Sequence, residues 1–147
     1  MDKSLMLDPG DFVGVSFWII SAAMVAATFF FYMERDRAVG KWKTSLSVAS
    51  LVTGIAAIHY FYMRDVWVAT GESPTVFRYV DWLLTVPLLL IELILVMQLP
   101  EGEAGPKMWK CGVFSGLMVA MGYPGEVGND ATARWGYCAL SLCPFMY

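Results

Sequence analysis

Apolar runs alternate with short polar connections along the whole chain. The runs predict five membrane-crossing helices, over residues 12–33, 45–64, 75–98, 108–123 and 131–147. A helix of about 20 apolar residues suffices to cross a bilayer, and the connections between the runs hold the glycines and prolines that are typical of turns. The predicted fold class is therefore all-α, a polytopic membrane helix bundle in one domain.

The third run differs from the others because it contains charged residues. At about 100° per residue, its polar side chains fall on one narrow face of the helix. We call this face the polar stripe; it consists of Arg78, Asp81, Thr85 and Glu92. A charge in hydrocarbon costs about 2.5–3.5 kcal/mol on insertion scales, so such residues indicate function. Because Asp81 and Glu92 are separated by roughly 16 Å along the axis, the stripe predicts a proton path.

The neighbours of the two acids predict different roles for them. Asp81 lies one turn from Arg78, so it can stay ionised and can accept a proton or balance a buried cation. Glu92 has no basic residue within a turn, so we expect it to hold its proton at neutral pH and to act as a donor. Thr85 can donate a hydrogen bond to Asp81. His59, on the preceding helix, is expected at the depth of Asp81 and in reach of it.

Simpler interpretations exist for each residue alone. Arg78 and Asp81 could form a structural ion pair, and Glu92 could extend along its stem to water. His59 could be a packing histidine. The combination of an arginine, two acids and a threonine on one face, with a histidine at matching depth, favours the functional interpretation.

Composition and charge support a membrane protein. Hydrophobic residues make up 58% of the chain, against about 45–50% in soluble domains. The net charge of −3 argues against nucleic acid as a partner, and the three cysteines have neither metal-ligand spacing nor the even number of a disulfide framework. Lysine and arginine concentrate in the first and third connections, which predicts that the N-terminus lies outside.

Residues 78–88, with the sequence RYVDWLLTVPL, resemble helix C of microbial rhodopsins, and of proteorhodopsins in particular. Residues 14–18, 34–37 and 71–77 also resemble that family, and the resemblance is close over residues 13–90. It implies a retinal-binding, light-driven outward proton pump, not an enzyme, in the inner membrane of a bacterial cell. It also implies the lipid bilayer and protons as partners and a homo-oligomer, a pentamer or hexamer.

The resemblance implies a role for each residue of the site. Asp81 would be the counterion and primary proton acceptor, with His59 as its partner, and Glu92 would be the cytoplasmic proton donor. Arg78 would help to gate proton release, and Thr85 would complete the Asp-Thr-Glu pattern of outward pumps. The retinal pocket would be lined by Trp82, Thr85, Leu89, Met118 and Gly122, with Leu89 at the position where leucine accompanies green absorption.

The family attaches retinal to a lysine in its seventh helix, whereas this chain ends in the fifth. Its own lysines are expected in loops or at helix ends: Lys3, Lys41, Lys43, Lys107 and Lys110. We therefore expect five of the seven helices of a rhodopsin, a polar stripe that faces lipid or a partner, and no covalent retinal on the chain alone. The alternatives are a sensory photoreceptor, although sensory members usually lack a carboxylate at Glu92, and a non-photoactive membrane scaffold or interaction fragment.

Overall fold

The computed structural model describes residues 6–100, 102–128 and 130–146. Within these ranges the chain forms helices and no strand, which confirms the predicted all-α fold. The elements are α1 (Phe12–Glu34), the short 3₁₀ helix η2 (Arg35–Arg37), α2 (Lys41–Thr70), α3 (Thr75–Val96), α4 (Ala104–Val127) and α5 (Ala131–Phe145). Tyr147, the predicted last residue of the fifth helix, and Lys3 lie outside the described residues.

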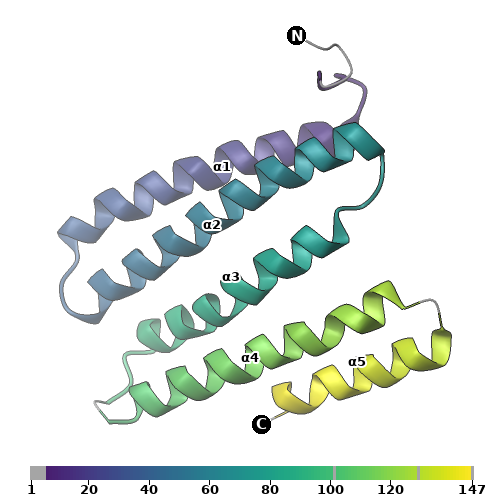
Figure 1. The fold of residues 1–147 in the computed structure, drawn as a ribbon. Helices are drawn as coiled ribbons and strands as arrows, with labels where there is room; N and C mark the ends of the chain where they lie inside the picture. The colour runs from purple at the N-terminus through teal and green to yellow at the C-terminus, as the bar shows by residue number, and fades with distance from the viewer. Residues whose placement is uncertain (1–5, 101, 129, 147) are drawn as a thin grey trace.

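The five long helices form an open row rather than a closed bundle (Figure 1). Each of them packs against the helices that precede and follow it in the chain. Among the described residues, helices that are not consecutive do not approach one another within 8 Å between Cα atoms. Many large apolar side chains are consequently exposed, as expected where the solvent is lipid rather than water.

Three of the helices are long and apolar enough to cross a membrane, as judged on the described residues: Phe12–Arg37, Lys41–Thr70 and Thr75–Val96. The sequence predicted two further spans, and these correspond to α4 and α5. Helix α5 has only 15 residues, too few to cross a bilayer, and the apolar run of α4 is interrupted by charged residues and glycines, which lower its mean hydropathy.

Two helices extend beyond the apolar runs that predicted them. Helix α2 covers Lys41–Thr70 instead of residues 45–64, and α4 covers Ala104–Val127 instead of 108–123. Charged residues end an apolar run but do not end a helix, since their side chains can reach water from the terminal turns. Helix α2 ends only at Gly71, whose φ of 69° is left-handed and favours glycine.

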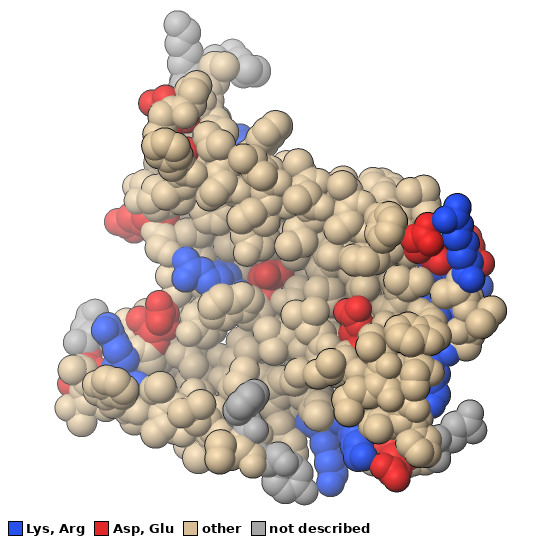
Figure 2. Space-filling model, turned by 180° about the vertical axis from the view of Figure 1, so that it is seen from behind, with Lys and Arg blue, Asp and Glu red and all other residues tan. Residues whose placement is uncertain are grey.

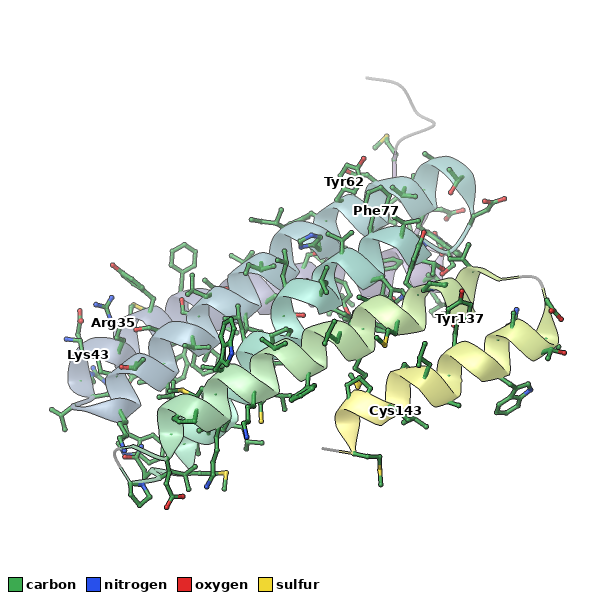
Figure 3. All side chains as sticks on the ribbon, turned by 60° about the horizontal axis from the view of Figure 1, so that its bottom comes forward. Arg35, Lys43, Tyr62, Phe77, Tyr137 and Cys143 are labelled. Carbon is green, nitrogen blue, oxygen red and sulfur yellow. The ribbon has the colours of Figure 1, made fainter. Side chains whose placement is uncertain are left out.

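Polar contacts between helices are concentrated where α1 meets α2 and where α2 meets α3. The hydroxyl of Thr28 lies 2.9 Å from that of Thr53, and the Ser50 hydroxyl donates to the Thr28 carbonyl at 3.1 Å. The rings of Tyr62 on α2 and Phe77 on α3 meet edge to face at 4.6 Å (Figure 3). The hydroxyl contacts thus join α1 to α2, and the ring contact joins α2 to α3.

Lysine and arginine gather at one end of the helix axes, where α1 ends and where α2 and α4 begin. We call this end the basic end; its residues are Arg35, Arg37, Lys41, Lys43, Lys107 and Lys110. Arg35 and Lys43 lie at this end in Figure 3, and the Lys41 ammonium donates to the carbonyl of Leu99, which joins the start of α2 to the segment that follows α3. Figure 2 shows that uncharged residues cover most of one face of the molecule.

Asp11 joins the start of α1 to the end of α2. Its Oδ1 accepts hydrogen bonds from the backbone N–H groups of Gly14 and Val13, at 3.0 and 3.1 Å, and its Oδ2 accepts one from the Trp67 indole at 2.8 Å. The Gly14 N–H is the largest influence on the Asp11 pKa. Together with the indole and the Val13 N–H, it holds this pKa below its usual value despite the opposing effect of desolvation.

Acid is expected to remove the stabilisation that Asp11 provides. Because its pKa is lower in the folded chain, the stabilisation is complete above the unfolded pKa and is lost as the pH falls through the folded pKa. Asp11→Ala should lower the melting temperature of the purified chain by about 2–4 °C at neutral pH, and by less in acid. Asp65→Ala, which removes an exposed carboxylate, is the control. An equal effect of Asp11→Ala at both pH values would contradict the prediction.

Candidate functional site

The polar stripe lies on α3, and its members differ in burial. Asp81 and Thr85 are each only 4% exposed, whereas Arg78 and Glu92 are half-buried. The expectation that the stripe faces lipid or a partner was therefore wrong for Asp81 and Thr85. Helix α3 packs between α2 and α4, and this packing already covers the middle of the stripe.

His59 on α2 lies against Asp81, as the matching depths predicted. Its Nδ1 is 3.5 Å from Asp81 Oδ1 and 2.9 Å from the carbonyl of Ile55. A carbonyl oxygen only accepts hydrogen bonds, so Nδ1 carries the proton and donates it to Ile55. The distance of 3.5 Å to the carboxylate is a close contact and not a hydrogen bond.

Asp81 Oδ1 is buried and lacks a hydrogen-bond donor among the described residues. A buried carboxylate oxygen without a donor is costly in a protein interior. It marks a position where a cationic or N–H-bearing group would be bound favourably. The side chain of Asp81, which is 6% exposed, therefore has the burial and the unmet bonding capacity of a counterion.

Thr85 forms a hydrogen bond to Asp81, but not to its side chain. The Thr85 hydroxyl donates to the backbone carbonyl of Asp81 at 2.8 Å. Threonine in a helix often bonds the carbonyl four residues earlier in this way. The prediction is thus corrected in one respect, because the contact leaves the Asp81 carboxylate free.

Arg78 is directed away from Asp81. Its guanidinium donates to the Ser73 hydroxyl at 2.8 Å, in the connection between α2 and α3. Of the carboxylates that the structure describes, none forms an ion pair with Arg78. The structural ion pair between Arg78 and Asp81 that we considered is therefore absent, and the arginine lies between Asp81 and the end of the row opposite the basic end.

Glu92 lies on the other side of Asp81, eleven residues further along α3. It is half-buried, and no hydrogen bond or ion pair joins it to any other described residue. Its position near the basic end places it about 16 Å from Asp81 along the axis, in the opposite half of α3.

The four other residues predicted to line a pocket lie on α3 and α4. Trp82 and Leu89 are 38% and 48% exposed on α3. Met118 lines a cavity of about 500 Å³, and a Cβ atom at Gly122 would lie 3.6 Å from the Tyr79 ring. The two α3 side chains are thus on a surface that nothing in the described chain encloses.

Tyr79 is a further residue of this region that was not predicted from the sequence. Its ring packs against Trp82 at 5.2 Å and against Tyr123 of α4 at 5.3 Å between centroids. It thereby links the aromatic side of α3 to α4 beside Gly122. The spacing of three residues between Tyr79 and Trp82 was the signal that could have indicated this aromatic cluster.

Comparison with known proteins gives consistent matches. Residues 11–147 match the family described as bacteriorhodopsin-like protein. A green-light absorbing proteorhodopsin from Gamma-proteobacterium EBAC31A08 is 57% identical over 141 residues, which cover 96% of this chain and 56% of that protein. The chain thus spans little more than half the length of that relative.

Solved structures agree in fold. A structure of xanthorhodopsin, described as a light-driven ion pump with dual chromophore, matches with a TM-score of 0.88 at 39% identity, over 95% of this chain and 62% of that one. The structure of a blue light-absorbing proteorhodopsin from Med12 matches with a TM-score of 0.77 at 46% identity, over 93% of this chain and 66% of that one. The family match includes His59 and the whole polar stripe.

Proposed function

The chain belongs to the bacteriorhodopsin-like family, and from this membership we propose that its helices form part of a retinal-based, light-driven outward proton pump. Members of this family are light-driven ion pumps or photoreceptors rather than enzymes. The observation that carries the proposal is Asp81, a buried carboxylate with His59 beside it and with one oxygen to which no residue that the structure describes donates a hydrogen bond.

The residues of the site fit retinal. When bound through a protonated imine, retinal would supply a positive charge. It would also supply a proton for transfer, because illumination would change the affinity of the imine nitrogen for that proton. The unmet oxygen of Asp81 suits such a charge. We propose that its pocket is formed by Trp82, Thr85, Leu89, Met118 and Gly122. The opposite wall would come from a part of the pump that corresponds to the portion of the relatives' length that this chain does not match.

The remaining residues define a direction for the proton. Asp81 accepts it. The guanidinium of Arg78, held by Ser73 on the side away from Glu92, lowers the proton affinity of acceptor groups on that side, so the proton is released there to solution. Glu92, half-buried near the basic end, returns a proton afterwards. The Nδ1–H group of His59 donates its hydrogen bond to the Ile55 carbonyl. His59 therefore fixes the position of the Asp81 carboxylate by contact rather than by a hydrogen bond.

The chain is a multi-pass membrane protein, and we propose that it lies in the inner membrane of a bacterial cell with its N-terminus outside. The basic end supports this orientation, since lysine and arginine favour the cytoplasmic side. Proton uptake through Glu92 would then occur from the cytoplasm and release past Arg78 to the outside. We also propose a homo-oligomer, a pentamer or hexamer, for the complete pump.

Complementation tests the proposal. We define the complemented pigment as this chain fused to the portion of the green-light absorbing proteorhodopsin that the match does not cover, with retinal added. We expect it to have a visible absorption band and to acidify the medium of illuminated cells. This chain alone should do neither. A pigment that forms but moves no protons would favour the photosensor, and the absence of a pigment would favour the scaffold.

A further inference from the structure

The ring of Tyr79 contacts two of the residues proposed for the retinal pocket. Its centroid is 5.2 Å from that of Trp82 on the same helix, and its Cε1 atom is 3.6 Å from the place that a Cβ atom at Gly122 of α4 would occupy. The ring also meets that of Tyr123 on α4 edge to face, at 5.3 Å between centroids. Tilted and edge-to-face pairs at such separations are favourable for aromatic rings. Tyr79 is therefore held by both helices where the proposed pocket crosses from α3 to α4.

Tyr79 also borders a cavity of about 310 Å³ between α3 and α4, which we call the lipid-side cavity. The rest of its wall comes from apolar side chains and one further ring: Val76, Val80, Leu83, Val119, Ala120 and Tyr123. The three α3 side chains among these, at positions 76, 80 and 83, are between 44% and 49% exposed. In a membrane, the lipid-side cavity is therefore in contact with lipid.

Helix geometry places Tyr79 between the retinal pocket and the lipid-side cavity. At about 100° per residue, Trp82 lies roughly 100° from Asp81 around the α3 axis. On the same scale, Leu83 and Val76 of the lipid-side cavity lie at roughly 200° and 220°. Tyr79 lies at roughly 160°, between the two groups. Its ring thus separates the side proposed for retinal from the side that faces lipid.

We propose that Tyr79 is a positioning residue, which closes the retinal pocket toward the lipid-side cavity and fixes the orientation of Trp82. A flat ring fits between the Trp82 and Tyr123 rings, whereas a smaller side chain would leave a gap that joins the two spaces. Closure matters because a reactive group in a pocket is protected from side reactions only while outside molecules are kept away. The inference rests on the proposed function, since it assigns a role within the proposed pocket.

Bleaching of the complemented pigment in the dark by hydroxylamine, which converts a retinal imine to an oxime, tests the closure. We expect Tyr79→Leu to bleach about tenfold faster than the parent, because the ring contacts that keep the pocket closed are lost. Its visible band should also shift, since Trp82 is no longer fixed. Tyr79→Phe keeps the ring and should bleach at the parent rate. Tyr123→Leu removes one of the ring contacts and should bleach at an intermediate rate.

Phe77→Leu is the matched control. It removes an aromatic contact of the same helix, with Tyr62 of α2 at 4.6 Å (Figure 3), and its position is roughly 140° from Trp82 around the axis. It should bleach at the parent rate. Circular dichroism confirms that each variant keeps its helices. If Tyr79→Leu does not fold, Tyr123→Leu decides the test, and bleaching at the parent rate would then exclude the proposed closure.

Fluorine NMR of the whole chain in detergent, labelled with 5-fluorotryptophan, tests the contact with Trp82 without retinal. The resonance that disappears in Trp82→Phe identifies Trp82. Tyr79→Leu should shift this resonance, because the neighbouring ring is lost, and should leave those of the other tryptophans in place. If the parent pigment did not form, the proposed function would fail, but this spectrum would still show whether Tyr79 holds Trp82.

Four results would overturn the inference. Bleaching of Tyr79→Leu at the parent rate would show that the ring closes nothing. Equally fast bleaching of Tyr79→Phe would assign the effect to the hydroxyl group, and equally fast bleaching of Phe77→Leu would assign it to a general loosening of α3. An unmoved Trp82 resonance in Tyr79→Leu would show that Tyr79 does not position Trp82.

Discussion

Asp81→Asn is expected to abolish proton release by the complemented pigment and to shift its visible absorption band. Asparagine has nearly the same shape as aspartate, but it is neutral and cannot take up a proton. The exchange therefore removes both the charge that would balance the chromophore and the acceptor of its proton. We expect the rate of light-driven acidification to fall at least about 100-fold, and absorption spectroscopy of the same sample to show the shifted band.

Asp65→Asn is the matched control, since it removes a carboxylate from α2 where the side chain is 65% exposed. It should alter neither the band nor the rate of acidification. If Asp81→Asn left both unchanged as well, Asp81 would be neither counterion nor acceptor. A shifted band with normal acidification would retain the counterion but exclude the acceptor role.

The surroundings of Asp81 show which features of the site could be predicted from sequence. The common face of Asp81 and Thr85 follows from the helical repeat, and the contact with His59 follows from counting residues inward from the connection between α2 and α3. Both depend only on regular helix geometry, which varies little between proteins. The contact at 3.5 Å between His59 and Asp81 confirms that reasoning.

Contacts that depend on the choice between nearby partners could not be predicted. Arg78 is within a turn of Asp81 but bonds Ser73, which lies five residues earlier. Thr85 bonds a backbone carbonyl in place of a carboxylate, because this acceptor is always in reach inside a helix. Spacing along the chain specifies which groups are near one another, but side-chain rotamers decide which of them bond.

The burial of the polar stripe depends on packing, which the sequence pattern did not specify. We expected the stripe to remain uncovered without further helices, yet Asp81 and Thr85 are buried where α3 packs between α2 and α4. Trp82 and Leu89, on other faces of the same helix, remain exposed. Periodicity thus identified the face that matters, whereas only the structure shows how far its neighbours cover it.

Glu92→Gln is expected to leave the colour of the complemented pigment nearly unchanged and to slow its recovery after a flash. Glu92 lies about 16 Å from Asp81 along α3, too far to affect the chromophore charge strongly in the way that Asp81 does. Glutamine cannot supply a proton, so return of the proton from the cytoplasmic side must occur without a positioned donor. We expect the recovery, followed by flash photolysis, to slow about 100-fold.

The dependence of the recovery rate on pH shows whether Glu92 is a proton donor or a structural residue. Without an internal donor, the recovery of the Glu92→Gln pigment should slow further by about tenfold for each unit rise in pH, because protons must come directly from solution. Recovery of the parent pigment should depend only weakly on pH. Glu103→Gln, which removes an exposed acid from the same end of the row, should behave as the parent does. If recovery of the Glu92→Gln pigment were as fast as that of the parent at every pH, the half-buried position of Glu92 would serve only packing, and the proton would have to return by another path.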